Sequence, residues 1–466
     1  METSIIKIME ANGRDELLEL EKMEKRAGER SRETEETVLG IIRDIKDNGD
    51  AALKKYSLRF DGGLPEQFEI GREQMKAAFD SADAEFKAAL TKAAANIREY
   101  HELQQTHGYE ISRDGALVGQ IVRGLDRVGL YVPGGTAAYP STVLMNGIPA
   151  KLAGVGELIA ATPPLAAALP ADALQETRHV QAASDAAEAN TLARPEQGAQ
   201  TMIANPDILA AAYLAGVDRV LLMGGAQAVA AMAYGTETVP RVDKIVGPGN
   251  IFVATAKRLL FGQVDIEMIA GPSEILIMAD ETAEPAYAAA DMLSQAEHDV
   301  NAAAILLTTS KSVAEGVSKQ LAEQLKNLER CETAKSSLKN HGIIIICRDL
   351  GEMCAIADRI APEHLEILTE EPLDALKLIR NAGSVFCGEF APEPLGDYYA
   401  GTNHVLPTSG TARFASPLGV YDFVKRMSYT FYTKEALEDA KNDIILIAER
   451  EGLTAHANAV RIRFGD

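Results

Sequence analysis

The chain has 466 residues, of which 47% are hydrophobic and 24% are charged, and its formal net charge at pH 7 is −22. This composition is typical of a soluble globular protein, and the length predicts about two to four domains. The negative charge argues against nucleic acid or anionic lipid as a partner. No apolar run reaches the roughly 18 residues that a membrane-spanning helix requires.

The first seven residues, Met-Glu-Thr-Ser-Ile-Ile-Lys, lack the basic flank and apolar stretch of a signal peptide. Only four cysteines occur, and no two of them form a Cys-x-x-Cys pair; they are Cys331, Cys347, Cys354 and Cys387. A disulfide framework or a structural zinc cluster is therefore not expected. We expect a protein of the reducing cytoplasm.

Residues 1–123 are predicted to form an N-terminal, mostly helical region. Apolar side chains recur there at steps of three and four residues, as in Leu17, Leu20 and Met23, and a further helix is expected over residues 84–103.

From residue 124 the pattern changes to short apolar strands that end in glycine turns. The strands are expected at residues 128–132, 158–161, 219–223 and 244–246. Strand, turn and helix in repetition predict parallel strands with right-handed crossovers, and ligands gather where such strands end. Residues 124–265 are therefore predicted as a first α/β domain. An alanine-rich insertion at residues 165–200 departs from this pattern, and no chemical role is assigned to it.

A second α/β domain is predicted over residues 266–395, with strands at 274–280, 304–308 and 342–346 separated by helices at 284–297 and 312–328. Residues 396–466 are predicted as a C-terminal segment with a helix at 434–451. The expected fold is thus α/β, with two Rossmann-like parallel-sheet domains, an N-terminal helical region and a small C-terminal helical tail.

Four short stretches bring imidazole and carboxylate groups together, and they hold four of the eight histidines. The stretches are Ser294-Gln295-Ala296-Glu297-His298, Ala361-Pro362-Glu363-His364, Gly396-Asp397 running on to Asn403-His404, and Glu451 with Gly452-Leu453-Thr454-Ala455-His456. Imidazole and carboxylate ligands suit a borderline metal such as zinc, and a catalytic zinc keeps one position open.

Each stretch also has an ordinary interpretation. Gln295 and His298 lie three residues apart, so they share a helix face, and a solvated surface helix is the ordinary interpretation of such a pair. The Glu363–His364 pair follows a proline bend, where neighbouring side chains can serve two proton transfers or form an exposed acidic loop. The stretch with His404 fits a polar turn, and that with His456 a frayed terminus. Their coincidence favours a metal-dependent active site.

Three glycine turns at strand ends are suited to present backbone amides to a phosphate, although no Gly-x-Gly-x-x-Gly occurs. They are Pro133-Gly134-Gly135, Gly224-Gly225-Ala226-Gln227 and Gly247-Pro248-Gly249-Asn250. Cys347 and Cys387 lie in apolar strands and are interpreted as core residues, not as nucleophiles for an aldehyde.

With these residues in place, the sequence resembles the histidinol dehydrogenase family from about Ile41 to Arg463. The resemblance rests on Leu130-Tyr131-Val132-Pro133-Gly134-Gly135, Val246-Gly247-Pro248-Gly249-Asn250, Ala270-Gly271-Pro272-Ser273-Glu274 and the four stretches above. It implies a cytoplasmic homodimer with shared active sites, which oxidises L-histidinol to L-histidine with two NAD and one zinc per site.

The resemblance also implies a role for particular residues. The zinc ligands would be Gln295, His298, Asp397 and His456, and the catalytic acid/base pair would be Glu363 and His364. Substrate contacts would come from Ser273, Gln295, His298, His364, Asp397, His404, Glu451 and His456. NAD contacts would come from Tyr131, Gln227 and Asn250.

The chain departs from the family pattern at residues 165–200, where family members have a shorter segment of different amino-acid composition. Two other functions stay open. A related zinc- and NAD-dependent dehydrogenase would oxidise another polar alcohol, but His404 and Glu451 favour a cationic substrate that carries an imidazole. A non-catalytic metal-binding or scaffold protein is expected to have lost the Glu363–His364 pair, which is intact here.

Overall fold

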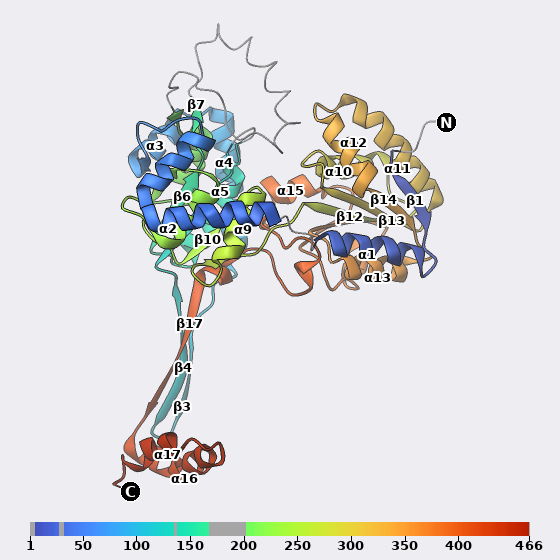
Figure 1. Cartoon of the computed structure of the whole chain (residues 1–466). Helices are drawn as coiled ribbons and strands as arrows, with labels where there is room; N and C mark the ends of the chain where they lie inside the picture. Colours follow the sequence, from blue (N-terminus) through green and yellow to red (C-terminus); the bar gives the residue numbers. More distant parts are fainter. Residues whose placement is uncertain (1–4, 28–31, 135–137, 167–201, 466) are drawn as a thin grey trace.

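The computed structural model describes residues 5–27, 32–134, 138–166 and 202–465. Two lobes, each built around its own sheet, lie side by side, and a long narrow arm projects from the first lobe to the C-terminus (Figure 1). Among the described residues, no helix is long and apolar enough to cross a membrane.

The first lobe is built on a six-stranded sheet in which five strands are parallel and the edge strand β2 is antiparallel. In spatial order its strands are β11 (Asp265–Ile266), β10 (Lys244–Val246), β5 (Arg127–Tyr131), β6 (Glu157–Thr162), β9 (Arg219–Leu222) and β2 (Glu69–Gly71). The four strands predicted for the first α/β domain are all present, and their parallel arrangement is confirmed.

Helices cover both faces of this sheet. One face packs against α3 (Arg72–Ser81), α4 (Ala84–Glu102), α5 (Pro140–Leu152) and α7 (Pro206–Ala215). The other face packs against α2 (Arg32–Phe60), α8 (Gly225–Tyr234) and α9 (Ile251–Leu260). The strands are buried on both sides, which explains why they appear in the sequence as continuous apolar runs.

The second lobe has a six-stranded sheet in which every strand is parallel to its neighbours. In spatial order its strands are β1 (Lys7–Glu10), β14 (Ile343–Ile346), β13 (Ala303–Thr308), β12 (Glu274–Ala279), β15 (His364–Leu368) and β16 (Ser384–Cys387). Side chains of β12 alternate between the two faces, with Ile275 and Ile277 in one core and Leu276 and Met278 in the other.

Five long helices cover the second sheet. Helices α10 (Pro285–Ala296), α11 (Lys311–Gln324) and α12 (Cys331–His341) pack on one face, and α1 (Asp15–Ala27) and α13 (Leu350–Ile360) on the other. The remaining helical segments are short; these are η2 (Leu325–Asn327) after α11, α14 (Pro372–Leu376) after β15, α15 (Glu393–Tyr398) after β16, and η3 (Thr411–Arg413) and η4 (Val420–Phe423) before the last strand.

The arm is a three-stranded antiparallel sheet of β3 (Tyr109–Arg113), β4 (Ala116–Gly124) and β17 (Val424–Tyr432). It carries α16 (Lys434–Arg450) and α17 (Thr454–Arg461) at its far end (Figure 1). The helix predicted at 434–451 is confirmed, but the arm strands were not predicted. Strands β3 and β17 have almost no buried side chain, so they lack the apolar alternation that indicates a strand.

Two further strands differ from the predictions. The segment after Pro362 was expected to be irregular, yet His364 begins strand β15 and pairs with Ile275 of β12. Strand β1, from a region predicted as mostly helical, pairs in parallel with β14 and forms the edge of the second sheet. The division of the chain after residues 123, 265 and 395 stays a prediction.

The alanine-rich insertion lies mostly outside the described residues, but its two ends are held together. Leu165–Ala166 (β7) pairs antiparallel with Met202–Ile203 (β8), so that Ala166 is opposite Met202. A two-residue Asn-Gly turn is suited to join two such opposed residues.

Replacing residues 167–201 by Asn-Gly is therefore expected to keep the melting temperature within about 3 °C of the parent. The zinc content of the shortened protein should equal that of the parent, because no predicted ligand lies in the segment. Thermal unfolding followed by circular dichroism, together with metal analysis, checks this. Loss of zinc would show that the segment supports the site.

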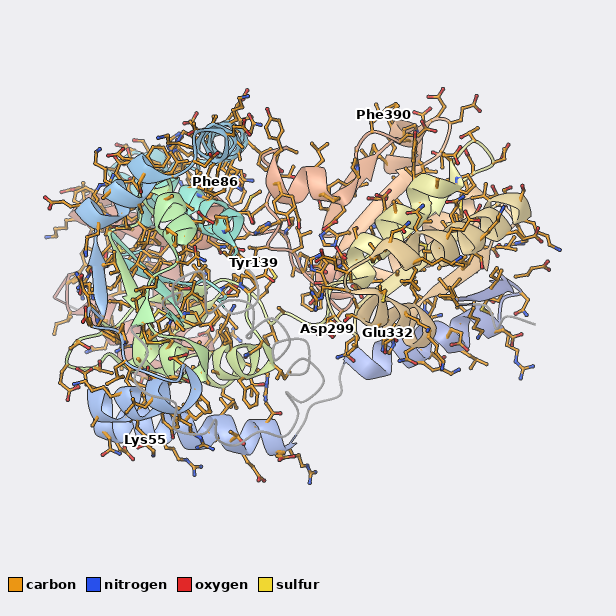
Figure 2. The ribbon with its side chains drawn as sticks, turned by 90° about the horizontal axis from the view of Figure 1, so that it is seen from above. Lys55, Phe86, Tyr139, Asp299, Glu332 and Phe390 are labelled. Carbon is orange, nitrogen blue, oxygen red and sulfur yellow. The ribbon has the colours of Figure 1, made fainter. Side chains whose placement is uncertain are left out.

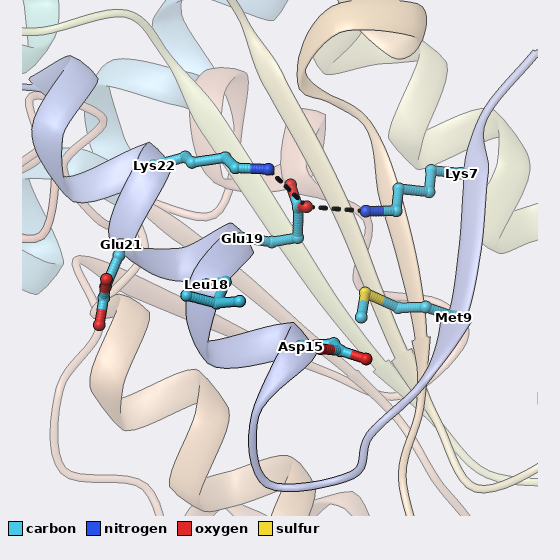
Figure 3. A pocket seen from close by; sticks show the side chains of 7 residues that line it. All are labelled: Lys7, Met9, Asp15, Leu18, Glu19, Glu21 and Lys22. Carbon is cyan, nitrogen blue, oxygen red and sulfur yellow. Dashed lines mark hydrogen bonds and ion pairs between the residues drawn. The ribbon is translucent and has the colours of Figure 1, made fainter.

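A pocket of about 510 Å³ lies between β1 and α1, at the outer edge of the second sheet. Glu19 is paired there with Lys7 and Lys22 at 2.8 Å each (Figure 3). Three strands, β14, β13 and β12, lie between β1 and β15, so this pocket is far from His364. We assign no chemistry to it.

Candidate active site

The residues predicted for catalysis gather where the two lobes face each other. Tyr139 of the first lobe and Asp299 of the second, which directly follows His298, lie on the facing sides (Figure 2). The segment from Gly401 to Ser409 connects the lobes. Asn403 donates to the Met145 carbonyl of α5 at 2.7 Å, and the Ser409 amide donates to the Glu274 carboxylate of β12 at 3.0 Å.

On the second sheet the site lies at the amino ends of the strands, not at the carboxyl ends as the general rule for parallel sheets predicts. His364 is the first residue of β15, and Ser273 directly precedes β12. Helix α10 runs back from the far end of β12, so its last turn returns Gln295 to the amino edge. The first sheet, in contrast, contributes its carboxyl edge, where Tyr131 ends β5.

His364 is buried, and the hydrogen bond that it makes defines which nitrogen is available. Its Nδ1 lies 3.2 Å from the Glu274 carbonyl oxygen, which can only accept, so Nδ1 carries the proton. Its Nε2 is buried and has no hydrogen-bond partner. Burial lowers the pKa of His364 to about 4, against the opposing effect of the bond to Glu274. The imidazole is therefore neutral at pH 7 and presents a free lone pair.

Glu363 is buried beside this histidine. Its Oε2 accepts a hydrogen bond from the Glu274 amide at 3.0 Å and lies 3.8 Å from His364 Nδ1. Burial raises the pKa of Glu363 well above its usual range, and the negative charges of Glu274, Asp397 and Glu393 raise it further. The site thus contains a proton carrier directly next to a neutral base.

A third acidic residue, Glu393, was not predicted. It begins α15, and its Oε1 lies 3.9 Å from His364 Nε2. Its carboxyl group shares a hydrogen bond with that of Asp397, which requires one of the two to keep a proton. Burial raises the pKa of Glu393 to about 8 and that of Asp397 to about 6. The Pro392-Glu393-Pro394 sequence, four residues before Asp397, was the available signal.

His364, Glu393 and Asp397 offer ligand atoms that all lie within 4.8 Å of one another, a spacing that suits one metal ion. This group overlaps the predicted ligand set only at Asp397. Two observations place further donors near this group. The Gln295 Oε1 is buried without a partner, and the charge of His298 acts on both His364 and Glu393. Oxygen and imidazole donors of this kind suit zinc.

His404 faces the same carboxylates from the connecting segment. Its Nδ1 donates to the Asp397 carbonyl oxygen at 3.1 Å, and its Nε2 lies 3.4 Å from the hydroxyl of Thr142 in α5. Burial lowers the pKa of His404 to about 4. His404 is therefore a neutral hydrogen-bonding group that also ties Asp397 to the first lobe.

Two predicted site residues do not reach this cluster within the chain. Glu451 directly follows α16 and His456 lies in α17, at the far end of the arm (Figure 1). Both are exposed there.

The three predicted NAD contacts lie in the first lobe. The Tyr131 hydroxyl accepts a hydrogen bond from the Gly225 amide at 3.0 Å, and Gln227 is buried in the first turn of α8. Asn250 caps α9 by accepting from the Phe252 and Val253 amides, which leaves its own amide hydrogens available. The fold and the site define an α/β enzyme with a buried acid/base pair beside a group of metal-type ligands.

Comparison with known proteins identifies the family. The sequence pattern of histidinol dehydrogenase matches residues 24–190 and 167–464. The chain is 47% identical over 461 residues to a histidinol dehydrogenase of Clostridium acetobutylicum, with 99% of both chains covered. It is 50% identical over 428 residues to that of Listeria innocua, with 92% of both covered.

A solved structure agrees with this assignment. The histidinol dehydrogenase of Elizabethkingia anophelis superposes with a TM-score of 0.85 at 33% identity, over 100% of this chain and 99% of that one. The chain therefore belongs to the histidinol dehydrogenase family, and the predicted resemblance is confirmed.

Proposed function

We propose that this protein oxidises L-histidinol to L-histidine through L-histidinaldehyde, the final steps of histidine biosynthesis, with NAD and one zinc per site. The observation that carries the proposal is the free Nε2 of His364, which is held neutral and buried beside Glu363 in the site between the lobes. The family to which the chain belongs supports the reaction class. We further propose that the enzyme acts in the cytoplasm.

His364 and Glu363 divide the proton transfers in this proposal. His364 Nε2 takes the proton of the substrate hydroxyl in the first oxidation. In its ionised form Glu363 takes a proton from water, whose oxygen then adds to the aldehyde before the second oxidation, and the raised pKa of Glu363 makes this carboxylate a stronger base. Gln295, His298, Asp397 and His456 would hold the zinc, with Glu393 close by. When bound, zinc supplies an electrophilic anchor for the substrate and NAD supplies the hydride acceptor.

The residues around the acid/base pair are suited to a small cationic substrate. The Asp397–Glu393 pair, which shares a proton, supplies negative charge, and Ser273 and His404 supply neutral hydrogen-bonding groups. Water exclusion would keep the aldehyde bound between the two oxidations, because His364 and Glu363 are both buried.

We also propose that the arm completes the site of a second copy of the chain. The two helices at its tip form too small a unit to build a core of their own. Several large apolar side chains remain exposed on them, including Ile444, Leu446, Ile447, Leu453 and Ile462. A homodimer would cover these side chains and bring Glu451 and His456 to the partner's cluster.

Incubation of the purified protein with L-histidinol and NAD tests the reaction. The expected result is formation of two NADH and one L-histidine per L-histidinol consumed. Turnover of other amino alcohols in preference to histidinol would favour the related dehydrogenase instead, and no turnover of any alcohol would favour a binding protein.

Removal of the metal is the matching prediction. Dialysis against a chelator is expected to remove one zinc per chain and to abolish the activity, and adding zinc back should restore both. His298→Asn should lower the zinc content measured by atomic emission, because it removes a nitrogen donor. His107→Asn, which changes an exposed histidine of the first lobe, is the matched control. Full activity in a metal-free sample would contradict the zinc requirement.

A further inference from the structure

A small polar cluster in the first lobe has unused hydrogen-bonding capacity. Asp61 directly follows helix α2, and its Oδ2 is buried without a partner. In the first turn of α8, the Nε2 of Gln227 is also buried without a partner, and Gln227 is only 1% exposed. A buried polar atom without a partner is costly, so two of them in one place indicate a missing ligand.

The two groups meet around the hydroxyl of Tyr131. The charge of Asp61 acts on this hydroxyl and contributes to the raised pKa of Tyr131, of which burial is the larger cause. The same hydroxyl accepts the Gly225 amide at 3.0 Å. Gly225 has a φ of +66°, and a Cβ added to it would lie 2.7 Å from Gln227 Oε1. Gly225 and Gln227 therefore lie against each other beside this hydroxyl, and Asp61 is close enough for its charge to act on it.

The chemistry of the cluster selects the kind of ligand. An ionised carboxylate can only accept hydrogen bonds, whereas the Gln227 amide nitrogen can only donate them. A sugar hydroxyl offers both functions on one atom. The shift of the Asp61 pKa to about 6 arises from burial, with a smaller opposing effect from Ser57, and no lysine or arginine among the described residues contributes to it. Nothing in the cluster would therefore neutralise an added phosphate.

The position of the cluster indicates which part of a dinucleotide it would meet. The cluster is built from α2, β5 and α8, which all belong to the first lobe, whereas His364 lies on β15 of the second. A nicotinamide ring that receives hydride must lie beside the substrate and His364. The opposite end of the dinucleotide, which carries the adenosine ribose, would then contact the first lobe.

We propose that Asp61 selects NAD over NADP by accepting a hydrogen bond from the 2′-hydroxyl of the adenosine ribose, while Gln227 donates to the same sugar. This inference rests on the proposed use of NAD. In NADP the 2′-hydroxyl carries a phosphate, whose negative charge would lie against the buried carboxylate of Asp61. The carboxylate thereby both binds the correct cofactor and repels the wrong one.

Calorimetric titration of the whole protein with NADH and NADPH tests the proposal. The parent protein is expected to bind NADH at least about 100-fold more tightly than NADPH. Asp61→Asn should weaken NADH binding about tenfold, through loss of a charge-assisted hydrogen bond, and should tighten NADPH binding. Asp47→Asn, at an exposed position of the same helix, is the matched control and should change neither value.

A modified cofactor separates direct contact from a structural effect. For the parent, 2′-deoxy-NADH should bind about tenfold more weakly than NADH. For Asp61→Asn the two cofactors should bind alike, because the partner of the hydroxyl is already gone. The variant should melt no lower than the parent, since it removes a buried charge.

The outcomes separate the two proposals. Absence of NADH binding to the parent would overturn the use of NAD, and this inference with it. Binding of NADH by the parent, with an unchanged NADH-to-NADPH ratio in Asp61→Asn, would overturn only the role of Asp61. The role of Asp61 would also be overturned if Asp61→Asn weakened the binding of NADH and of 2′-deoxy-NADH by the same factor.

Discussion

His364→Asn is expected to slow both oxidation steps by a factor of about 10² to 10⁴, the usual contribution of a positioned general base. The imidazole Nε2 is the buried, unpartnered nitrogen of the site, and asparagine offers no basic nitrogen in its place. Rates of NADH formation measured separately with L-histidinol and with L-histidinaldehyde check this. His107→Asn controls for the loss of a histidine elsewhere.

Glu363→Gln should separate the two steps. It keeps an oxygen to accept the Glu274 amide, so the start of β15 should hold its position, but it cannot take a proton from water. Oxidation of the aldehyde should therefore fall far more than oxidation of the alcohol. Glu370→Gln, an exposed change on the same segment, should affect neither step. The assignment is wrong if the alcohol step stops while the aldehyde step continues.

Mixing two inactive variants should restore activity if sites are shared between chains. His298→Asn changes the site on the lobes, and His456→Asn changes the tip of the arm. Each variant alone should be nearly inactive. A hybrid dimer contains one site that takes the intact arm of the first variant and the intact lobes of the second. With random re-association of equal amounts, about a quarter of the parental activity is expected.

This test requires proof that dimers containing one chain of each variant have formed. Carrying a different affinity tag on each variant and purifying through both isolates the mixed dimer, which should have about half the parental activity. A mixture of His298→Asn with Asp397→Asn is the matched control. Both changes lie in the lobes, so every hybrid site would be damaged. No activity in the purified His298–His456 hybrid would show that each site is built within one chain.

Much of the fold was predictable from the sequence because both sheets are buried on both faces. Strands such as β5 and β9 then appear as apolar runs, and glycine turns follow them. The same reasoning fails for β15, since His364 and Glu366 put an imidazole and a carboxyl group into a buried strand. It fails for the arm because strands exposed on both faces have no apolar period.

The candidate site was predictable only in part. The predicted acid/base pair rests on two adjacent residues, and its burial could be known only once β15 was placed beside β12. Glu393 escaped notice because nothing local links it to His364, which lies 29 positions earlier. Asp61 was missed for the same reason, since its neighbours Tyr131 and Gln227 are distant in sequence and meet it only in the folded lobe.

Because the two sheets present opposite edges to the space between the lobes, the electrostatic potential differs between the two sides of that space. Helix α10 points its carboxyl end at the residues around Gln295, and the peptide dipoles of a helix concentrate negative potential at that end. Helices α8 and α9 begin at the carboxyl edge of the first sheet, where their amino ends create positive potential. One side of the space is therefore favourable to a cation and the other to a phosphate, before any side chain is counted. The order of strands and helices by itself therefore favours a cation at the second lobe and an anion at the first.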